Sequence, residues 1–186
     1  MADPETPSPL ADGATDSAQA PDLCTGCGMC CSGLLHSAAV LDDDEVVAAA
    51  SIGLAVLDRP GRPGFALPCT KLRGTTCSIY GSRPRVCSRF RCQVLIDLEE
   101  ERHSFAEASA HVATAKQLLT ELRAVTPAPA SPDEVRTMIR TAVSSSDHHA
   151  VRLRSTALAF YLDRHFRQAK EGKVLEMTEL GAGDGQ

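Results

Sequence analysis

The feature that most constrains this chain is the placing of its eight cysteines. All of them lie in the first half of the 186 residues, and none follows residue 92. They are Cys24, Cys27, Cys30, Cys31, Cys69, Cys77, Cys87 and Cys92. A single buried cysteine is an ordinary core residue, but eight gathered into one short segment indicate chemistry that uses the thiol. Such a chain is expected to fold around its thiols, through disulfides or through bound metal.

The leading motif is Cys24-Thr-Gly-Cys27-Gly-Met-Cys30-Cys31. Its first three thiols recur every third residue, and a loop in which Gly26 and Gly28 take positive φ would bring them together. Thiolates favour zinc, iron–sulfur clusters or Cu(I) and bind hard cations poorly. Eight thiols match two tetrahedral four-cysteine sites, one cluster with a spare site, or a binuclear arrangement, and the sequence leaves these open.

Disulfides are the main alternative to metal. No lysine or arginine precedes Arg59, so the start lacks the basic segment of a secretory signal, and we expect a cytoplasmic protein. Disulfides are rare in a reducing cytoplasm. A redox CxxC of the thioredoxin type needs a βαβ context that the pattern does not provide. The longest uncharged apolar run, Val46–Leu57, is too short to cross a bilayer, so no membrane association is expected.

Charge is distributed as unevenly as cysteine. Residues 1–58 hold ten acids and no bases, whereas residues 59–92 hold eight bases and no acids. Cations near a thiol favour the thiolate, so we expect the basic stretch to lower the pKa of the cysteines beside it. A nucleic-acid footprint is the rival interpretation. The net charge of −5 and the scarcity of aromatic residues argue against it.

The predicted fold is mainly α, with an irregular, loop-rich, metal-stabilised cysteine module and a C-terminal three-helix hairpin or bundle. We divide the chain into a disordered tail at 1–22, the cysteine-cluster module at 23–96, a helical region at 97–172 and a flexible tail at 173–186. The first tail is rich in proline and acids and has few large apolar residues, so it cannot offset its ordering entropy.

Local signals place the elements within these parts. Asp42 and Glu45 predict a capping box for a helix that stops at Gly53, and a short strand is expected at Ser78–Tyr80. Further on, an apolar stripe over 97–125 predicts one long helix. Ser131, Pro132 and Glu134 then signal the start of a second helix, and a third is expected over Asp147–Lys170.

The residues from Cys24 to Cys92 resemble a known family, the CxxCxxCC cysteine-cluster proteins (YkgJ-like), described as zinc- or iron-chelating domains. The resemblance lies in the CxxCxxCC motif, the prolyl-cysteine Pro68-Cys69, and the run Cys77-Ser-Ile-Tyr80 followed by Arg83-Pro84 and Cys87. It covers about residues 23–92 and implies metal chelation by all eight cysteines. One departure is Ser88, where the resemblance leads us to expect arginine.

Three hypotheses follow. The first is a cytoplasmic metal-binding protein that holds zinc or iron, the latter also as an iron–sulfur cluster, through the eight cysteines. The second is an enzyme whose metal or cluster keeps an open coordination position for redox or modifying chemistry. The third is an interaction module with structural zinc, in which the helical region binds a protein partner.

His36 is an alternative metal ligand that could replace one of the cysteines, while the histidines of the helical region are expected at the surface.

Overall fold

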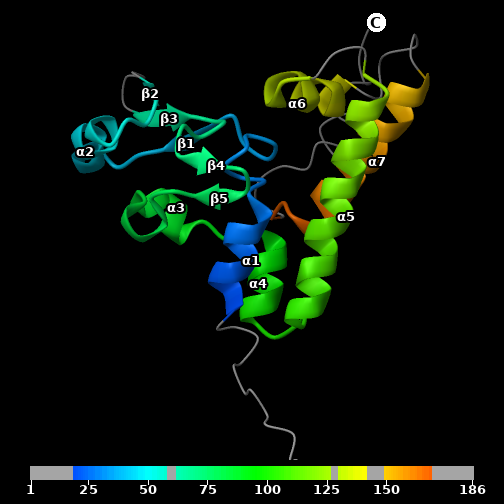
Figure 1. Ribbon diagram of the computed structural model, residues 1–186, viewed down its shortest axis with the longest axis horizontal. Coiled ribbons are helices and arrows are strands. Elements are labelled where there is room, and N and C mark those ends of the chain that lie inside the picture. Colours follow the sequence, from blue (N-terminus) through cyan, green and yellow to red (C-terminus); the bar gives the residue numbers. More distant parts are fainter. Residues whose placement is uncertain (1–18, 58–61, 127–129, 142–148, 169–186) are drawn as a thin grey trace, which may run out of the picture.

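The computed structural model describes residues 19–57, 62–126, 130–141 and 149–168 of the chain. Within these residues the chain is mainly α, as predicted, with a loop-rich cysteine region and C-terminal helices (Figure 1). The α-helices are α1 (Ala20–Cys27), α2 (Val46–Ser51), α3 (Arg85–Arg89), α4 (Gln93–Glu99), α5 (Phe105–Ala124), α6 (Pro132–Thr141) and α7 (His149–His165). The predicted disordered tail at 1–22 overlaps α1, which begins at Ala20 after its N-cap Gln19. The rest of that tail, residues 1–18, and the predicted tail at 173–186 lie outside the described residues.

The cysteine region contains two small antiparallel sheets. The first has the order β1-β3-β2, formed by β1 (Ala38–Val40), β3 (Gly64–Ala66) and β2 (Val56–Leu57). The second is a hairpin of β4 (Leu72–Arg73) and β5 (Thr76–Cys77). The strand predicted at Ser78–Tyr80 is wrong, because the hairpin ends at Cys77 and a 3-10 helix occupies Tyr80–Ser82.

The acids before α2 do not cap a helix as predicted. Asp42 makes no side-chain capping bond, and a 3-10 turn at Asp43–Glu45 precedes α2. Arg85 binds these acids instead: its Nε lies 2.8 Å from a carboxylate oxygen of Asp42, and its backbone N–H donates to Glu45 over 2.9 Å. The expected stop at Gly53 is present, with φ at +76°. A partner forty residues away in sequence therefore displaces the local cap.

The stripe predicted as one helix over 97–125 is divided between α4 and α5. The break contains Glu101 with φ at 57°, the left-handed conformation that ends a helix. Ser104 then caps α5 in a complete capping box with Glu107. The second predicted start is confirmed: Ser131 and Glu134 exchange bonds in the same way, with Pro132 as the first residue of α6.

The described residues form two apolar cores. The larger joins α1 and α4 to the three C-terminal helices, where α7 packs against both α5 and α6. The smaller is formed by five buried side chains around the first sheet, namely Leu41, Ala49, Leu54, Phe65 and Leu67. Figure 1 shows α1 and α4 between the strands and α5, and α1 contacts α4, α5 and β5. None of the helices in the described ranges has the length and apolar character that a membrane span needs.

Candidate metal centre

The first two cysteines of the motif lie on a helix and not in the loop that the sequence predicted. Cys24 and Cys27 are on α1, three residues apart and thus on one face. Gly28 ends the helix with φ at +71°, as expected, while Gly26 remains helical. A Cβ on Gly28 would lie 3.0 Å from the Cα of Thr75 in the hairpin. Glycine at this position therefore lets the end of α1 approach the hairpin that carries Cys77.

The remaining cysteines lie in the turn after α1, before β4, on β5, on α3 and at the start of α4. Cys30 and Cys31 lie in the tight turn after α1, where the N–H of Ser32 donates to Gly28 O over 2.8 Å. The N–H of Cys69 donates to the carbonyl oxygen of Cys31, also over 2.8 Å. Cys87 lies on α3, and Cys92 is the N-cap residue of α4. The fold thus draws together thiols that are as much as 68 positions apart in sequence.

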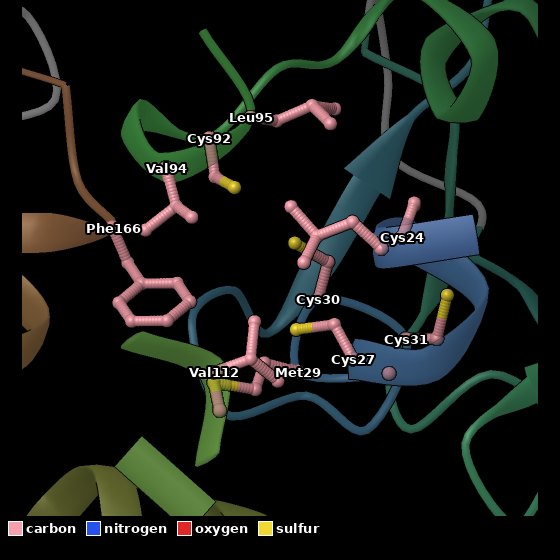
Figure 2. Close-up of a pocket in the computed structure, with 12 residues that line it drawn as sticks. Cys24, Cys27, Met29, Cys30, Cys31, Cys92, Val94, Leu95, Val112 and Phe166 are labelled. Atoms are coloured by element: carbon pink, nitrogen blue, oxygen red, sulfur yellow. The ribbon is translucent and has the colours of Figure 1, made fainter. Parts of the chain in front are cut away.

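One pocket shows this gathering directly (Figure 2). Its walls contain five of the eight cysteines, Cys24, Cys27, Cys30, Cys31 and Cys92. Apolar side chains complete the lining, and two of them, Val112 and Phe166, belong to α5 and to the segment that follows α7. The helical half of the protein therefore forms part of the wall around the thiols.

Burial raises the pKa of the thiols, contrary to the sequence expectation. It raises the pKa of Cys31 to about 11 and that of Cys92 to about 12, with neighbouring thiols adding to the effect. For Cys24 the effect of burial outweighs the opposing charges of Arg83 and Arg91. The arginines therefore lower the thiol pKa values by less than burial raises them. Metal coordination would have to displace the thiol protons.

Several arginines of the basic stretch also bind groups other than the thiols. Arg85 pairs with the acids before α2, and Arg91 lies 2.8 Å from Glu99. The guanidinium of Arg83 lies over the Tyr80 ring, 3.6 Å from its centroid, and donates to the Tyr80 carbonyl oxygen over 3.3 Å.

The donor set fits a thiophilic metal, because every cysteine is a free thiol and five share one pocket. Within the described ranges no three His, Cys, Asp or Glu side chains stand as a closed ligand set around one point. The fit therefore rests on donor chemistry and on the gathering of the thiols. His36, the alternative ligand, places its ring edge-on to Phe90 at 5.0 Å between centroids.

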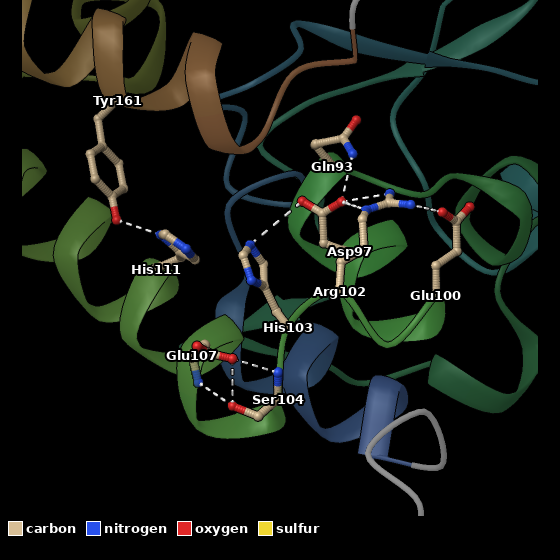
Figure 3. A network of polar contacts seen from close by, with 9 residues as sticks. All are labelled: Gln93, Asp97, Glu100, Arg102, His103, Ser104, Glu107, His111 and Tyr161. Atoms are coloured by element: carbon tan, nitrogen blue, oxygen red, sulfur yellow. Dashed lines mark hydrogen bonds and ion pairs between the residues drawn. The ribbon is translucent and has the colours of Figure 1, made fainter.

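Sequence reasoning missed a second cluster, made of three histidines, of which Figure 3 draws His103 and His111. The ring centroid of His111 lies 5.0 Å from that of His103, and His111 stacks on the third histidine, His165, at 4.2 Å between centroids. The Tyr161 hydroxyl is 2.8 Å from His111 Nδ1. These half-buried rings are not the surface histidines that were expected. No sequence spacing identifies them, because the packing of α5 against α7 brings them together.

This cluster makes stability depend on pH. Burial lowers the pKa of His111 and His165, and the neighbouring imidazoles lower it further, against the opposing charge of Asp97. A depressed histidine pKa means that the folded protein binds fewer protons than the unfolded chain. The stabilisation is complete above the ordinary value of about 6.5 and is lost as the pH falls below it.

We therefore expect the free energy of unfolding to fall between about pH 7 and pH 5.5. The double variant His111→Gln, His165→Gln should show a smaller fall in urea titrations across this range. His149→Gln is the control, because that exposed residue lies at the start of α7 away from the cluster. Equal pH dependence in the double variant and the unaltered protein would contradict the assignment.

Comparison with known proteins agrees with the donor set. The family model CxxCxxCC, described as "Putative zinc- or iron-chelating domain", matches residues 23–112. The match continues past Cys92 through α4 and ends at Val112, a residue of the pocket wall. Searches of curated proteins and of solved structures give no match.

Proposed function

Residues 23–112 belong to the CxxCxxCC family of zinc- or iron-chelating domains, and from this premise we propose that the protein binds zinc or iron through its eight cysteines. The observation that carries the proposal is the pocket lined by five cysteines from α1, the turn after it and the start of α4. Thiolate ligands select zinc, iron–sulfur clusters or Cu(I), and the family description narrows the choice to zinc or iron. Thiolates from α1, the turn after it and the start of α4 would hold such an ion, and these segments are far apart in the chain.

We also propose that the protein works in the cytoplasm, because a reducing compartment keeps cysteine thiols available for metal. There the apolar wall of the pocket, with Leu95, Val112 and Phe166 among its members, would limit access of water to the thiols.

Metal analysis of the full chain, purified without oxygen, tests the proposal. We expect zinc or iron bound in at least equimolar amount, and an iron–sulfur cluster would add visible absorption bands. The variant Cys27→Ser, Cys30→Ser should retain less metal, whereas Ser88→Ala should retain as much as the unaltered protein. A colourless protein with less than one ion per chain, even after reconstitution with zinc or with iron and sulfide, would overturn the proposal.

A further inference from the structure

We infer that the eight cysteines form two adjacent sites of four thiols each, and that each site holds its own metal centre. The inner site consists of Cys24, Cys27, Cys30 and Cys92. The outer site consists of Cys31, Cys69, Cys77 and Cys87. This partition rests on the proposed function, and it decides among the arrangements that the cysteine count left open.

The four inner thiols share one location. All four line the pocket of Figure 2, where the sulfur atoms of Cys27, Cys30 and Cys92 face the same space. The same three residues pack against the larger core. Among the other thiols, that of Cys30 interacts most strongly with Cys92, then with Cys27 and Cys24, and least with Cys31. Cys24 also interacts with Cys77 of the outer group, so its place in the inner site rests on the pocket that it lines.

The outer thiols are grouped around the smaller core. Cys69 and Cys87 pack against that core and not against the larger one. The backbone bond of 2.8 Å from Cys69 to Cys31 holds these two segments side by side. The thiol of Cys31 interacts most strongly with Cys69 and next with Cys77. The thiol of Cys87 interacts with all three, Cys31, Cys69 and Cys77.

The boundary between the sites passes between two consecutive residues. Cys30 belongs to the inner group, while Cys31 lies at the edge of the pocket with its sulfur to one side in Figure 2. Arg83 also lies at this boundary, because it interacts with Cys24 of the inner site and with Cys87 of the outer site. Its positive charge would offset the repulsion between two four-thiolate centres.

The two sites would connect different parts of the fold. The inner site is walled by the helical half, through Val112 and Phe166, so its metal would tie the cysteine region to α5 and α7. The outer site joins the turn after α1 to the hairpin and α3, all within the cysteine region. Four thiolates around one ion are the typical ligand set of a closed structural site.

Cadmium, which substitutes for zinc in thiolate sites, is the probe. In the full-length protein loaded with cadmium-113, we expect two resonances, each coupled through bonds to the β-protons of its own four cysteines. Cys92→Ser should shift or remove one resonance and Cys87→Ser the other. Ser88→Ala, beside Cys87, should change neither. The couplings are read from the unaltered protein, so a variant that fails to fold leaves the test intact.

The outcomes separate this inference from the proposed function. A cysteine coupled to both ions, a mixed grouping such as Cys30 with Cys69, or a single resonance would overturn the partition while leaving metal binding in place. A protein that binds no cadmium, zinc or iron would overturn the proposed function, and the partition with it.

Discussion

Removal of the metal is expected to unfold the region around the smaller core while the C-terminal helices stay folded. That core has only five buried side chains, and its strands are two or three residues long. So little apolar burial does not offset the entropy of ordering the loops between them. A structural zinc site contributes roughly 10–16 kcal/mol to the folding of small domains, so its loss should be decisive here.

Hydrogen exchange before and after treatment with a chelator, in reducing buffer, measures this effect. Amides of β1 and β3 should lose their protection, whereas those of α5 and α7, which pack in the larger core, should keep most of theirs. Re-addition of zinc should restore the first group. Protection of β1 and β3 that survives removal of the metal would mean that the small core is sufficient by itself.

Phe166→Ala should produce a large loss of stability although it removes no metal ligand. Phe166 is 1% exposed, packs in the larger core and lines the cysteine pocket. Its carbonyl oxygen also accepts the N–H of Gln93 at the start of α4 over 3.0 Å. Truncation of a buried phenylalanine costs about 3–5 kcal/mol, from lost transfer free energy and the cavity left behind. Urea denaturation of the metal-loaded protein measures the change.

The matched control is Phe160→Ala on α7. Phe160 is 57% exposed, so its removal should change the free energy of unfolding by no more than about 0.5 kcal/mol. Similar losses in the two variants would contradict the placement of Phe166 in the wall between the helical half and the thiols.

The features that the sequence predicted correctly rest on local signals. The start of α6 follows from Ser131, Pro132 and Glu134, whose contacts all lie within three residues. Gly28 and Gly53 take the positive φ that their positions in the sequence suggested. In each case the physical cause lies within one turn of the chain.

Two of the incorrect predictions involve contacts between distant parts of the chain. The acids at 42–45 satisfy every local rule for a helix cap, but they form ion pairs with Arg85, and Asp42 makes no capping bond. Likewise, the cation-rich stretch suggested thiols with low pKa values, whereas burial in the tertiary structure raises them. Neither burial nor a long-range ion pair can be derived from the spacing of residues.

The same limit applies to the candidate site. The positions of the eight cysteines indicated metal, but the sequence did not divide them, since Cys30 and Cys31 are neighbours and differ in nothing local. Their separation depends on which distant segment each one meets, the start of α4 or the strand-rich region near Cys69. The histidine cluster depends in the same way on the packing of α7 against α5.

X-ray absorption at the metal edge of the full-length protein tests the central claim most directly, because it reports the atoms bound to the metal. If thiolates hold the metal, the first shell should contain sulfur alone, at about 2.3 Å for zinc. Replacing Cys92 with serine should introduce oxygen or lower the metal content. A first shell dominated by nitrogen or oxygen in the unaltered protein would contradict the claim that these cysteines are the ligands.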